Sequence, residues 1–417
     1  MTMQEVSRYA VGLDVGTTTV RAVVGHSDAP GKAPTIIGVG QHENTGMRKG
    51  TLVNLVNAAQ AIDKALEEAE RMSGHQIHEA TISINGSHIV GMSSRGVVAV
   101  GTGGHEINEE DLARVEEAAT VVQLPANREI LEVTPRSYQL DDQDNIKDPL
   151  GMTGVRLEVD AHVITALGPN LKNLQKACEM TETRPAHTVL AGLAAARAVL
   201  SDQQMENGVA LIDLGGTTTN IAVYEEGDLQ HVAVLPVGSV NITNDLAIGL
   251  KTDLHIAEQV KLQHAQATGE RKEDKVSVKL DKATHDFEVS EIDEIVEARL
   301  EEIFELINKE LKSIGRAAKL PGGVVLTGGG AELKGIADYA REALQLSARV
   351  GKPSGLGGVA DQVETPSFAT AVGLMLIDLE GTAVHGPQQQ GGNGSDLSGM
   401  LGGFTQKAKG LLGKFRS

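Results

Sequence analysis

Two segments of the chain, residues 11–19 (VGLDVGTTT) and 211–219 (LIDLGGTTT), carry residue types that could hold anionic oxygens. In each, an apolar run ends in an aspartate, Asp14 or Asp213, and glycine, threonines and a second apolar run follow. This pattern predicts a β-hairpin, and glycine at its turn lets backbone N–H groups converge on one anion. Two copies predict a duplicated fold that clamps a polyphosphate between its halves, with Asp14 and Asp213 facing a magnesium ion.

A third glycine-rich segment, residues 327–330 (TGGG), follows an apolar run at 324–326. Helical spacing then covers residues 333–344, so we expect the glycines to open this helix. Bare backbone and a helix N-terminus would then lie beside a ligand. Such a junction suits the base, ribose or α-phosphate of a nucleotide, although taken alone it is also compatible with a plain tight turn.

The elements that must position these segments form a repeated α/β pattern. In the first half, apolar runs predict strands at 20–24, 35–39 and 80–84, and helical spacing predicts a helix over 52–72 that Gly74 ends. This β-β-β-α-β order is typical of a ribonuclease-H-like unit.

Each half carries an insertion. Residues 86–163 combine strand-like runs with a Glu-rich helix at 109–122, and they predict an inserted α+β subdomain. In the second half, residues 240–290 form another insertion, and a helix over 290–312 follows it.

Composition narrows the class of protein. At 417 residues the chain is long enough for two lobes, and with 41% hydrophobic but 2% aromatic residues its cores must be aliphatic. A net charge of −19 argues against nucleic acid as a partner. The single cysteine, Cys178, excludes an internal disulfide and fits a reducing cytosol. We expect neither a signal peptide nor a membrane-spanning helix, so attachment to a membrane would be peripheral.

The C-terminal end has a different character. Residues 381–396 are rich in Gly and Gln and predict a flexible linker. Residues 397–417 then predict a basic amphipathic helix, for which a bilayer is the favoured partner over a protein groove or the chain's own surface. Its apolar and basic positions include Leu397, Met400, Leu401, Phe404, Lys407, Leu411, Leu412, Lys414, Phe415 and Arg416.

Attachment through this helix is expected to be weak for one chain. Each basic residue near anionic lipid contributes about 1 kcal/mol, but five glycines oppose helix formation by up to about 1 kcal/mol each. Polymerisation would strengthen attachment, because every added anchor binds at high effective concentration. We therefore hypothesise that nucleotide-bound copies assemble into a filament whose tails all face the membrane.

The order of two phosphate hairpins and a Gly-Gly-Gly loop resembles that of the actin, Hsp70 and sugar-kinase superfamily. Longer stretches are similar to one of its families, the FtsA family of bacterial cell-division proteins. These stretches are residues 37–50, 134–157, 191–194, 325–331 and 369–374. The similarity covers the chain from residue 8 to about 380 and resumes at the tail, and the segment 86–164 is specific to FtsA and its pilus-assembly relatives.

The resemblance implies an α/β, two-lobed, actin-like ATPase fold with an inserted subdomain in the first lobe and a C-terminal amphipathic helix. ATP would lie between the lobes, with hydrated Mg²⁺ held by Asp14 and Asp213. Phosphate contacts are implied for Gly16, Thr17, Thr18, Thr19, Gly215, Gly216, Thr217 and Thr218. Adenosine contacts are implied for Glu258, Lys261, Gly328, Gly329 and Gly330; without the family, an i, i+3 Glu–Lys pair is more often a surface ion pair.

Partners are also implied by the family. The C-terminal peptide of FtsZ would bind near Arg299 and Glu302, a pair that could equally be an exposed salt bridge. Further implied partners are other copies of the chain in a filament, anionic lipids, and later division proteins on residues 86–164. The implied location is the cytoplasmic face of the plasma membrane at the division site.

The second hairpin departs from the family pattern. Thr217 stands where a third glycine is usual, and Asn220 stands where aspartate is common. We expect nucleotide binding to survive and hydrolysis to be slow, so the chain is a weak ATPase at most. Asp213, through a metal or water contact, is the best candidate to activate a water molecule.

Two other functions would use the same cleft. An ATP-binding scaffold of a pilus-assembly machine shares the inserted subdomain, and a small-molecule kinase shares the nucleotide site but has no use for a basic tail. A chaperone of the Hsp70 type fails on length, because about 35 residues follow the expected ATPase.

The expected division of the chain has six parts. They are 8–85 with 165–193 and 364–380 for the core of the first lobe (1A), 86–164 for the inserted subdomain (1C), 194–228 with 303–363 for the core of the second lobe (2A), 229–302 for subdomain 2B, 381–396 for the linker and 397–417 for the membrane-targeting helix.

Overall fold

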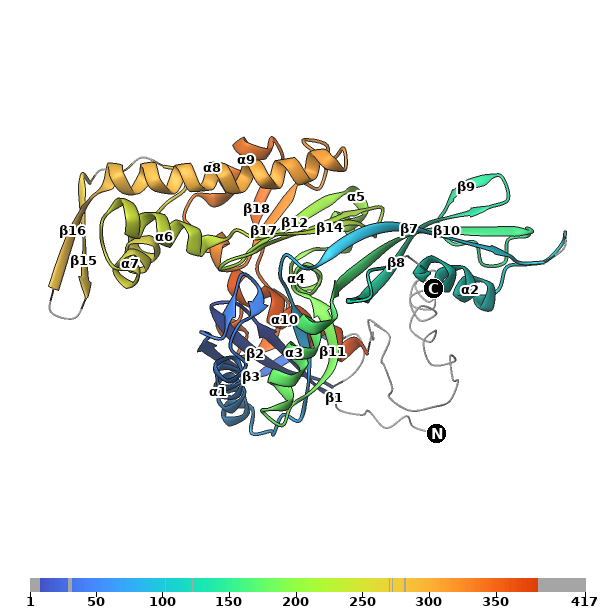
Figure 1. Ribbon diagram of the computed structural model, residues 1–417, viewed down its shortest axis with the longest axis horizontal. Coiled ribbons are helices and arrows are strands. Elements are labelled where there is room, and N and C mark those ends of the chain that lie inside the picture. The colour runs from blue at the N-terminus through green and yellow to red at the C-terminus, as the bar shows by residue number, and fades with distance from the viewer. Residues whose placement is uncertain are drawn as a thin grey trace.

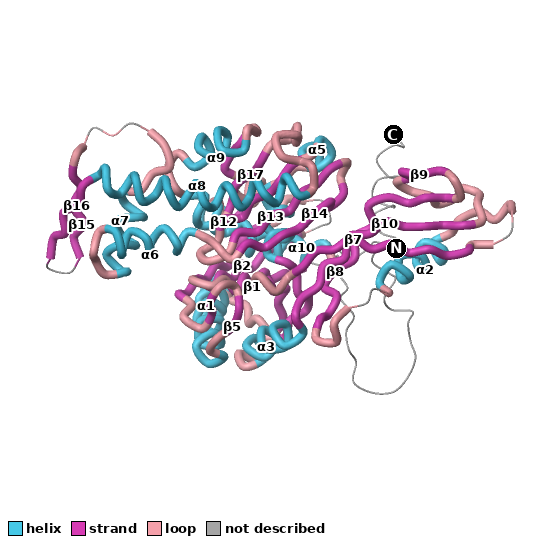
Figure 2. The backbone as a smooth tube through the Cα atoms, turned by 45° about the horizontal axis from the view of Figure 1, so that its top comes forward, coloured by secondary structure: helices cyan, strands magenta, loops and turns pink. Residues whose placement is uncertain are grey.

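The computed structural model describes residues 8–28, 32–101, 103–121, 124–269, 271, 273–280 and 283–381. Two sheets form the centre of the molecule, one in each lobe (Figure 1). A strand-rich subdomain projects from one end, and a helical region with a two-stranded hairpin forms the opposite end (Figures 1 and 2). The two-lobed α/β architecture predicted from the sequence is confirmed.

The first lobe is built on a six-stranded sheet in the order β11-β6-β1-β2-β3-β19. β1 and β2 pair antiparallel through the predicted hairpin, and β6 runs parallel to β1. The strands are β1 (Arg8–Val15), β2 (Thr19–Ser27), β3 (Thr35–Glu43), β6 (Glu79–Ile84), β11 (Arg184–Leu190) and β19 (Gly357–Gly358).

Helices cover both faces of this sheet: α1 (Leu55–Ser73) and α3 (Gly168–Glu179) one face, and α10 (Ala369–Glu380) the other. Asn54 caps α1 by accepting the N–H of Asn57, and Gly74 ends it with a φ of 73°. The helix starts at Leu55 rather than at residue 52, because Leu52 belongs to a short hairpin, β4 (Met47–Arg48) and β5 (Thr51–Leu52).

Glycines let the backbones of neighbouring elements pack in direct contact at two places, between β1 and α10 and between α10 and α4. A Cβ on Gly12 of β1 would meet backbone atoms of Ala371 and Met375 in α10. A Cβ on Gly373 of α10 would overlap the backbone of Ala194 in α4 (Ala191–Val199), so the two helices pack almost backbone to backbone. A core with so few aromatic side chains achieves its density through such small residues.

The inserted subdomain is a four-stranded antiparallel sheet in the order β7-β10-β8-β9, covered by one helix. Its elements are β7 (Val90–Ala99), α2 (Glu109–Thr120), β8 (Arg128–Leu140), β9 (Gln143–Ile146) and β10 (Arg156–Leu167). Asn108 and Asp111 form a capping box at the start of α2. The subdomain has an apolar core of its own, centred on Val115, Leu157 and Val159.

The second lobe is built on a five-stranded sheet in the order β14-β13-β12-β17-β18, so that β14 is an edge strand. Its strands are β12 (Val209–Leu214), β13 (Thr219–Glu225), β14 (Asp228–Leu235), β17 (Val324–Thr327) and β18 (Ala348–Val350). Its other elements are α5 (Asp202–Asn207), α6 (Ser239–Gly249), α7 (Leu254–His264), β15 (Lys275–Leu280), β16 (Ala283–Glu288), α8 (Val289–Ser313) and α9 (Ile336–Leu344). The apolar stripe of α8 belongs to the core of this lobe, and Figure 2 shows the helix running from the β15–β16 hairpin to the sheet.

Strands β11 and β14 were not predicted from the sequence. Part of β11 is polar, and the alternation in β14 is interrupted by His231, so neither shows a clear period. Among the residues that the structure describes, none of the helices combines the length and the apolar character that a membrane span requires.

Candidate functional site

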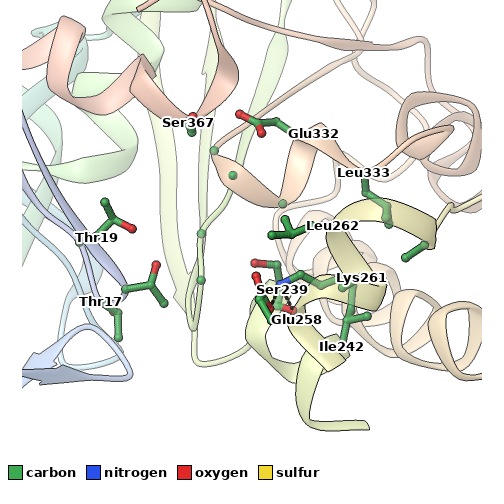
Figure 3. A pocket seen from close by; sticks show the side chains of 18 of the residues that line it. Thr17, Thr19, Ser239, Ile242, Glu258, Lys261, Leu262, Glu332, Leu333 and Ser367 are labelled. Carbon is green, nitrogen blue, oxygen red and sulfur yellow. Dashed lines mark hydrogen bonds and ion pairs between the residues drawn. The ribbon is translucent and has the colours of Figure 1, made fainter. Parts of the chain in front are cut away.

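A cleft of about 920 Å³ opens between the two lobes. Figure 3 shows Thr17 and Thr19 on one side of it and Ser239, Glu258 and Lys261 on the other. With one exception, Thr217, every residue predicted to bind the nucleotide lines this cleft. These residues are Gly16, Thr17, Thr18, Thr19, Gly215, Gly216, Thr218, Glu258, Lys261, Gly328, Gly329 and Gly330.

The first turn, residues 15–19, is held in place from the lobe beneath it. A Cβ on Gly16 would lie 2.6 Å from the carbonyl oxygen of Thr19, so the turn is too tight for a side chain there. The Asn44 amide donates to the carbonyl of Gly16 at 2.8 Å. Gly50 donates its N–H to the hydroxyl of Thr17 at 3.1 Å, which fixes that hydroxyl at the cleft wall.

The second turn, residues 214–219, is pinned by the start of α6. Ser239 donates its N–H to the carbonyl of Gly215 at 3.0 Å, and Val240 donates to that of Gly216 at 2.7 Å. A Cβ on Gly216 would lie 2.8 Å from the Thr18 methyl group of the first turn. The two glycine-threonine turns therefore face each other across the cleft, as the duplicated pattern predicted.

Thr217 is placed differently from the other threonines. It does not line the cleft, and its hydroxyl is buried without a hydrogen-bond partner among the described residues. Its side chain therefore contributes nothing to the cleft wall, and any role at a phosphate falls to its backbone.

Both predicted metal ligands lie at the floor of the cleft. The Ser83 hydroxyl donates to Asp14 at 2.8 Å, and the Asn220 amide donates to Asp213 at 2.9 Å. Burial raises the pKa of Asp14, and burial together with the charge of Asp14 raises the pKa of Asp213 to about 7. Two buried carboxylates in such proximity favour a bound cation, because a cation stabilises their ionised forms.

This donor set fits Mg²⁺ in particular. Magnesium prefers one or two carboxylates and keeps several waters, rather than a cage of protein ligands. Asp14 and Asp213 supply two carboxylates, and the described residues contain no group of three or more His, Cys, Asp or Glu side chains that could hold a metal. These two side chains would hold a bound Mg²⁺, which would supply neutralisation of phosphate charge.

Arg21 is a cleft residue that the sequence reasoning missed. It lies directly opposite Asp14 in the β1–β2 register, and its guanidinium stacks 5.3 Å from the ring centre of Phe368. Burial lowers the pKa of Arg21, while the charges of Asp14, Glu332 and Asp213 oppose that shift. A half-buried cation at the cleft floor suits a phosphate oxygen, and its position seven residues after Asp14 was the signal available in the sequence.

The Glu258–Lys261 pair lies at the opposite wall, on α7. Lys261 is 2.7 Å from Glu258 and donates to the Thr243 hydroxyl of α6 at 2.9 Å, and that hydroxyl donates to Glu258 at 2.5 Å. The Lys261 side chain is only 10% exposed. The pair is thus fixed in the cleft wall by hydrogen bonds to Thr243, and it is not a solvated surface ion pair.

The Gly-Gly-Gly segment lies where it was predicted, at the end of β17, but it does not open an α-helix. A 3₁₀ helix, η1 (Gly329–Glu332), follows it, and α9 starts only at Ile336. Gly328 has a φ of 80°, and a Cβ there would overlap the Asp213 carboxylate. The tight turn is therefore required by the approach of β12, and bare backbone rather than an α-helix N-terminus faces the cleft.

Arg299 and Glu302 are not part of the cleft. They lie on α8, where Arg299 pairs with Glu302 and, at 2.5 Å, with Asp245 of α6. Hydrogen bonding to Asp245 is the largest cause of the raised pKa of Arg299. The predicted linker after Gly381 and the amphipathic helix 397–417 lie outside the described residues.

Comparison with known proteins agrees with this geometry. The family described as "Cell division protein FtsA" matches residues 210–373, and the "SHS2 domain inserted in FTSA" matches residues 86–165. The chain is 36% identical over 374 residues to a cell division protein FtsA of Pseudomonas aeruginosa, covering 89% of each chain. It is 39% identical over 380 residues to that of Bacillus subtilis, covering 90% of this chain and 84% of the relative.

Solved structures share the fold at much lower identity. A PilM–PilN type IV pilus biogenesis complex superposes with a TM-score of 0.65 at 17% identity, over 89% of this chain and 98% of that one. MreB5 of Spiroplasma citri bound to ADP gives a TM-score of 0.54 at 13% identity, over 89% and 97% of the two chains. The sequence relatives, the inserted domain and this fold agree: the chain is an actin-like cell-division protein and belongs to the FtsA family.

Proposed function

We propose that this protein binds ATP with Mg²⁺ between its lobes and, assembled on the cytoplasmic membrane, tethers FtsZ at the division site. One observation carries the nucleotide part of the proposal. Two glycine-threonine turns, from chain segments almost 200 residues apart, face each other across a single cleft whose floor holds Asp14 and Asp213. An anionic chain of phosphates with a cation fits that arrangement.

The assignment of groups follows from the positions of the residues. Backbone N–H groups of the two turns, their threonine hydroxyls and Arg21 would hold the phosphates, and Asp14 and Asp213 would hold the metal. The Glu258–Lys261 pair would bind the ribose, because a carboxylate accepts hydrogen bonds from hydroxyl groups and an ammonium donates to them. The backbone of Gly328, Gly329 and Gly330 would lie against the adenosine.

Hydrolysis is proposed to be slow. Asp213 is the candidate for holding the attacking water, but its neighbour in the register is the neutral Asn220 rather than a second acid. The chain would then act chiefly as a nucleotide-dependent switch, and any ATPase activity would be weak.

The remaining parts of the proposal concern partners. We propose that the FtsZ C-terminal peptide docks near Arg299 and Glu302, that later division proteins dock on residues 86–164, and that copies of the chain form a filament. Residues 397–417 would attach the filament to anionic lipid, because four basic residues alternate there with apolar ones. The subdomain division given above from the sequence is part of the same proposal.

The experiment that tests this function uses the full chain on an anionic lipid monolayer, viewed by electron microscopy with and without Mg-ATP. Filaments that need both nucleotide and lipid are expected, and deletion of residues 382–417 should abolish them while leaving ATP binding intact. A tail-deleted protein that binds the monolayer as well as the full chain would overturn the membrane part. Absence of ATP binding by the full chain would overturn the nucleotide part.

A further inference from the structure

One threonine hydroxyl in each of the two facing turns accepts a hydrogen bond from a group outside the turn. Thr218 accepts from the side-chain amide of Asn85 at 3.1 Å, and Thr17 accepts from the N–H of Gly50 at 3.1 Å. A hydroxyl that accepts in this way keeps its own hydrogen available to donate. Because Thr17 and Thr218 both line the cleft, each hydroxyl is available to donate to an anionic oxygen there.

The two donors meet at the root of the inserted subdomain. Asn85 is the last residue before that subdomain, and its side-chain oxygen accepts the N–H of Gly86 at 2.7 Å. A Cβ on Gly50 would lie 2.7 Å from the Cα of Gly86, so these two backbones are in direct contact. The hydroxyls of both turns are therefore connected to a single point, where the chain enters the subdomain.

The inserted subdomain contacts the second lobe through residues of its sheet. Arg136 of β8 donates to the carbonyl oxygen of Gln230 in β14, and the Lys147 ammonium lies 2.9 Å from Asp228, the first residue of β14. A Cβ on Gly91 of β7 would lie 2.9 Å from a Val232 methyl group, so the two edges pack closely. The polypeptide enters the subdomain from the first lobe and returns to that lobe. The subdomain nevertheless contacts β14, the edge strand of the second lobe, as Figures 1 and 2 show.

We propose that Asn85 is a positioning residue that links polyphosphate binding at Thr218 to the orientation of the inserted subdomain, residues 86–165. The inference rests on the proposed function, because it concerns the same cleft. A chain of hydrogen bonds runs from the N–H of Gly86 through Asn85 to Thr218, and a phosphate oxygen would extend it by one acceptor. Hydrogen bonds in such a chain polarise one another, so the ligand strengthens the contact between the lobes at the subdomain's root.

The donor-to-acceptor direction of these hydrogen bonds requires an amide side chain at position 85, which accepts from Gly86 and donates to Thr218. An ionised aspartate at position 85 only accepts, so it would take the Thr218 hydrogen that the phosphate needs and would add a negative charge to the cleft. Asn85→Asp is therefore expected to weaken polyphosphate binding more than Asn85→Ala does.

The first test measures binding of Mg-ATP and of inorganic tripolyphosphate to the full chain by calorimetry. Asn85→Ala is expected to raise both dissociation constants about tenfold, the effect of one lost hydrogen bond to a partly buried partner, and Asn85→Asp by more. Thr218→Ser should bind like the wild type, whereas Thr218→Val should not. Asn127→Ala, at an exposed position of the subdomain, is the matched control and should change nothing.

A double-mutant cycle separates a shared role from two independent ones. If Asn85 acts through the Thr218 hydroxyl, Asn85→Ala costs little once Thr218 is valine, so the two losses do not add. Additive losses would show that Asn85 acts independently of Thr218 and would overturn the inference.

The second test measures subdomain orientation as a distance between two spin labels, on Glu117→Cys in α2 and Lys309→Cys in α8, both exposed positions. The natural Cys178 can stay, because it is fully buried and burial raises the pKa of its thiol to about 12. In the wild type, Mg-ATP and tripolyphosphate should narrow the distance distribution. In Asn85→Ala the distribution should be broader without ligand and should not narrow with it.

The outcomes separate this inference from the proposed function. Asn85→Ala distributions that match the wild type, with and without ligand, would overturn the inference while ATP binding persists. A wild type that binds no ATP would overturn the proposed function, and the tripolyphosphate and ligand-free measurements would still decide whether Asn85 sets the orientation of the subdomain.

Discussion

Asn220 donates a hydrogen bond from its side-chain amide to the Asp213 carboxylate at 2.9 Å, with the two residues 1% and 6% exposed. In the first hairpin, the residue at the same place in the register, opposite Asp14, is Arg21. The two aspartates at the cleft floor therefore lie opposite unlike residues in their hairpins, a cation for Asp14 and a neutral amide for Asp213. This difference fits the pKa of Asp213, which is raised to about 7 by burial and by the charge of Asp14.

Replacement of Asn220 by aspartate should destabilise the protein when no divalent cation is present. A third carboxylate beside two buried ones adds like-charge repulsion and removes the donor to Asp213, an expected loss of about 1–3 kcal/mol in the free energy of unfolding. Mg-ATP should recover most of the loss. Thermal unfolding with and without Mg-ATP measures both effects.

Asn207→Asp is the control for this change, because it alters the net charge equally at an exposed position. If Asn220→Asp and Asn207→Asp melt at the same temperature without metal, the floor of the cleft does not carry the proposed charge repulsion.

Gly328→Ala should abolish nucleotide binding and lower the free energy of unfolding by about 2–4 kcal/mol. The new methyl group would overlap the Asp213 carboxylate, and its backbone φ of 80° strains any residue with a side chain. Gly329→Ala is the matched control for stability one position away, since a Cβ there meets nothing within 4 Å of the protein. Calorimetric titration of Gly328→Ala with ATP and urea unfolding of both variants test the prediction, and equal losses of unfolding free energy in the two variants would contradict it.

Lys261→Ala should weaken ATP binding about tenfold but leave tripolyphosphate binding nearly unchanged, because Lys261 and Glu258 lie at the proposed ribose end of the cleft. The loss of its ammonium also leaves the Thr243 hydroxyl with one partner fewer.

The pair Lys64–Glu67 provides the control. It has the same i, i+3 spacing and the same 2.7 Å separation, but the Lys64 side chain is 54% exposed on α1. Lys64→Ala should change neither affinity. An equal loss for both ligands in Lys261→Ala would instead place Lys261 at the phosphates.

Acid should destabilise the contact between the inserted subdomain and β14. Burial, and the charges of Arg136 and His231, lower the pKa of His162 to about 3, whereas an unfolded chain restores it to about 6.5. The unfolded state therefore binds the proton first, so stability is full above pH 6.5 and falls as the pH drops from there toward 3. The slope from this one group is at most about 1.4 kcal/mol per pH unit.

Urea unfolding at pH 7, 6, 5 and 4 measures this slope. His162→Gln should flatten it, while His42→Gln, at an exposed position of β3, should leave it as in the wild type. An unchanged slope in His162→Gln would show that other groups govern the acid response.

The sequence alone identified the parts of the site that repeat. The two glycine-threonine hairpins and the glycine triplet were recognisable because a tight turn that needs glycine leaves a signature in the sequence itself, whatever surrounds it. The end of α1 at Gly74 was also predicted, because glycine is a local cap, whereas its start was predicted at residue 52 and lies at Leu55, after the cap Asn54. The family followed from the order of these motifs and is confirmed by the relatives.

Only the tertiary structure decided which residues far apart in the sequence come together in the cleft. Whether Glu258 and Lys261 form a cleft wall or a surface pair depends on α6 packing against α7, and no spacing within α7 reveals it. Asn85 and the start of α9 were missed for the same reason: each owes its place to a neighbour far along the chain. Arg21 was missed although it lies opposite Asp14 in a hairpin that the sequence predicts. A short sequence pattern determines a turn because the turn depends only on the backbone conformations of a few consecutive residues. A site between lobes depends instead on which surfaces, distant in the sequence, pack together.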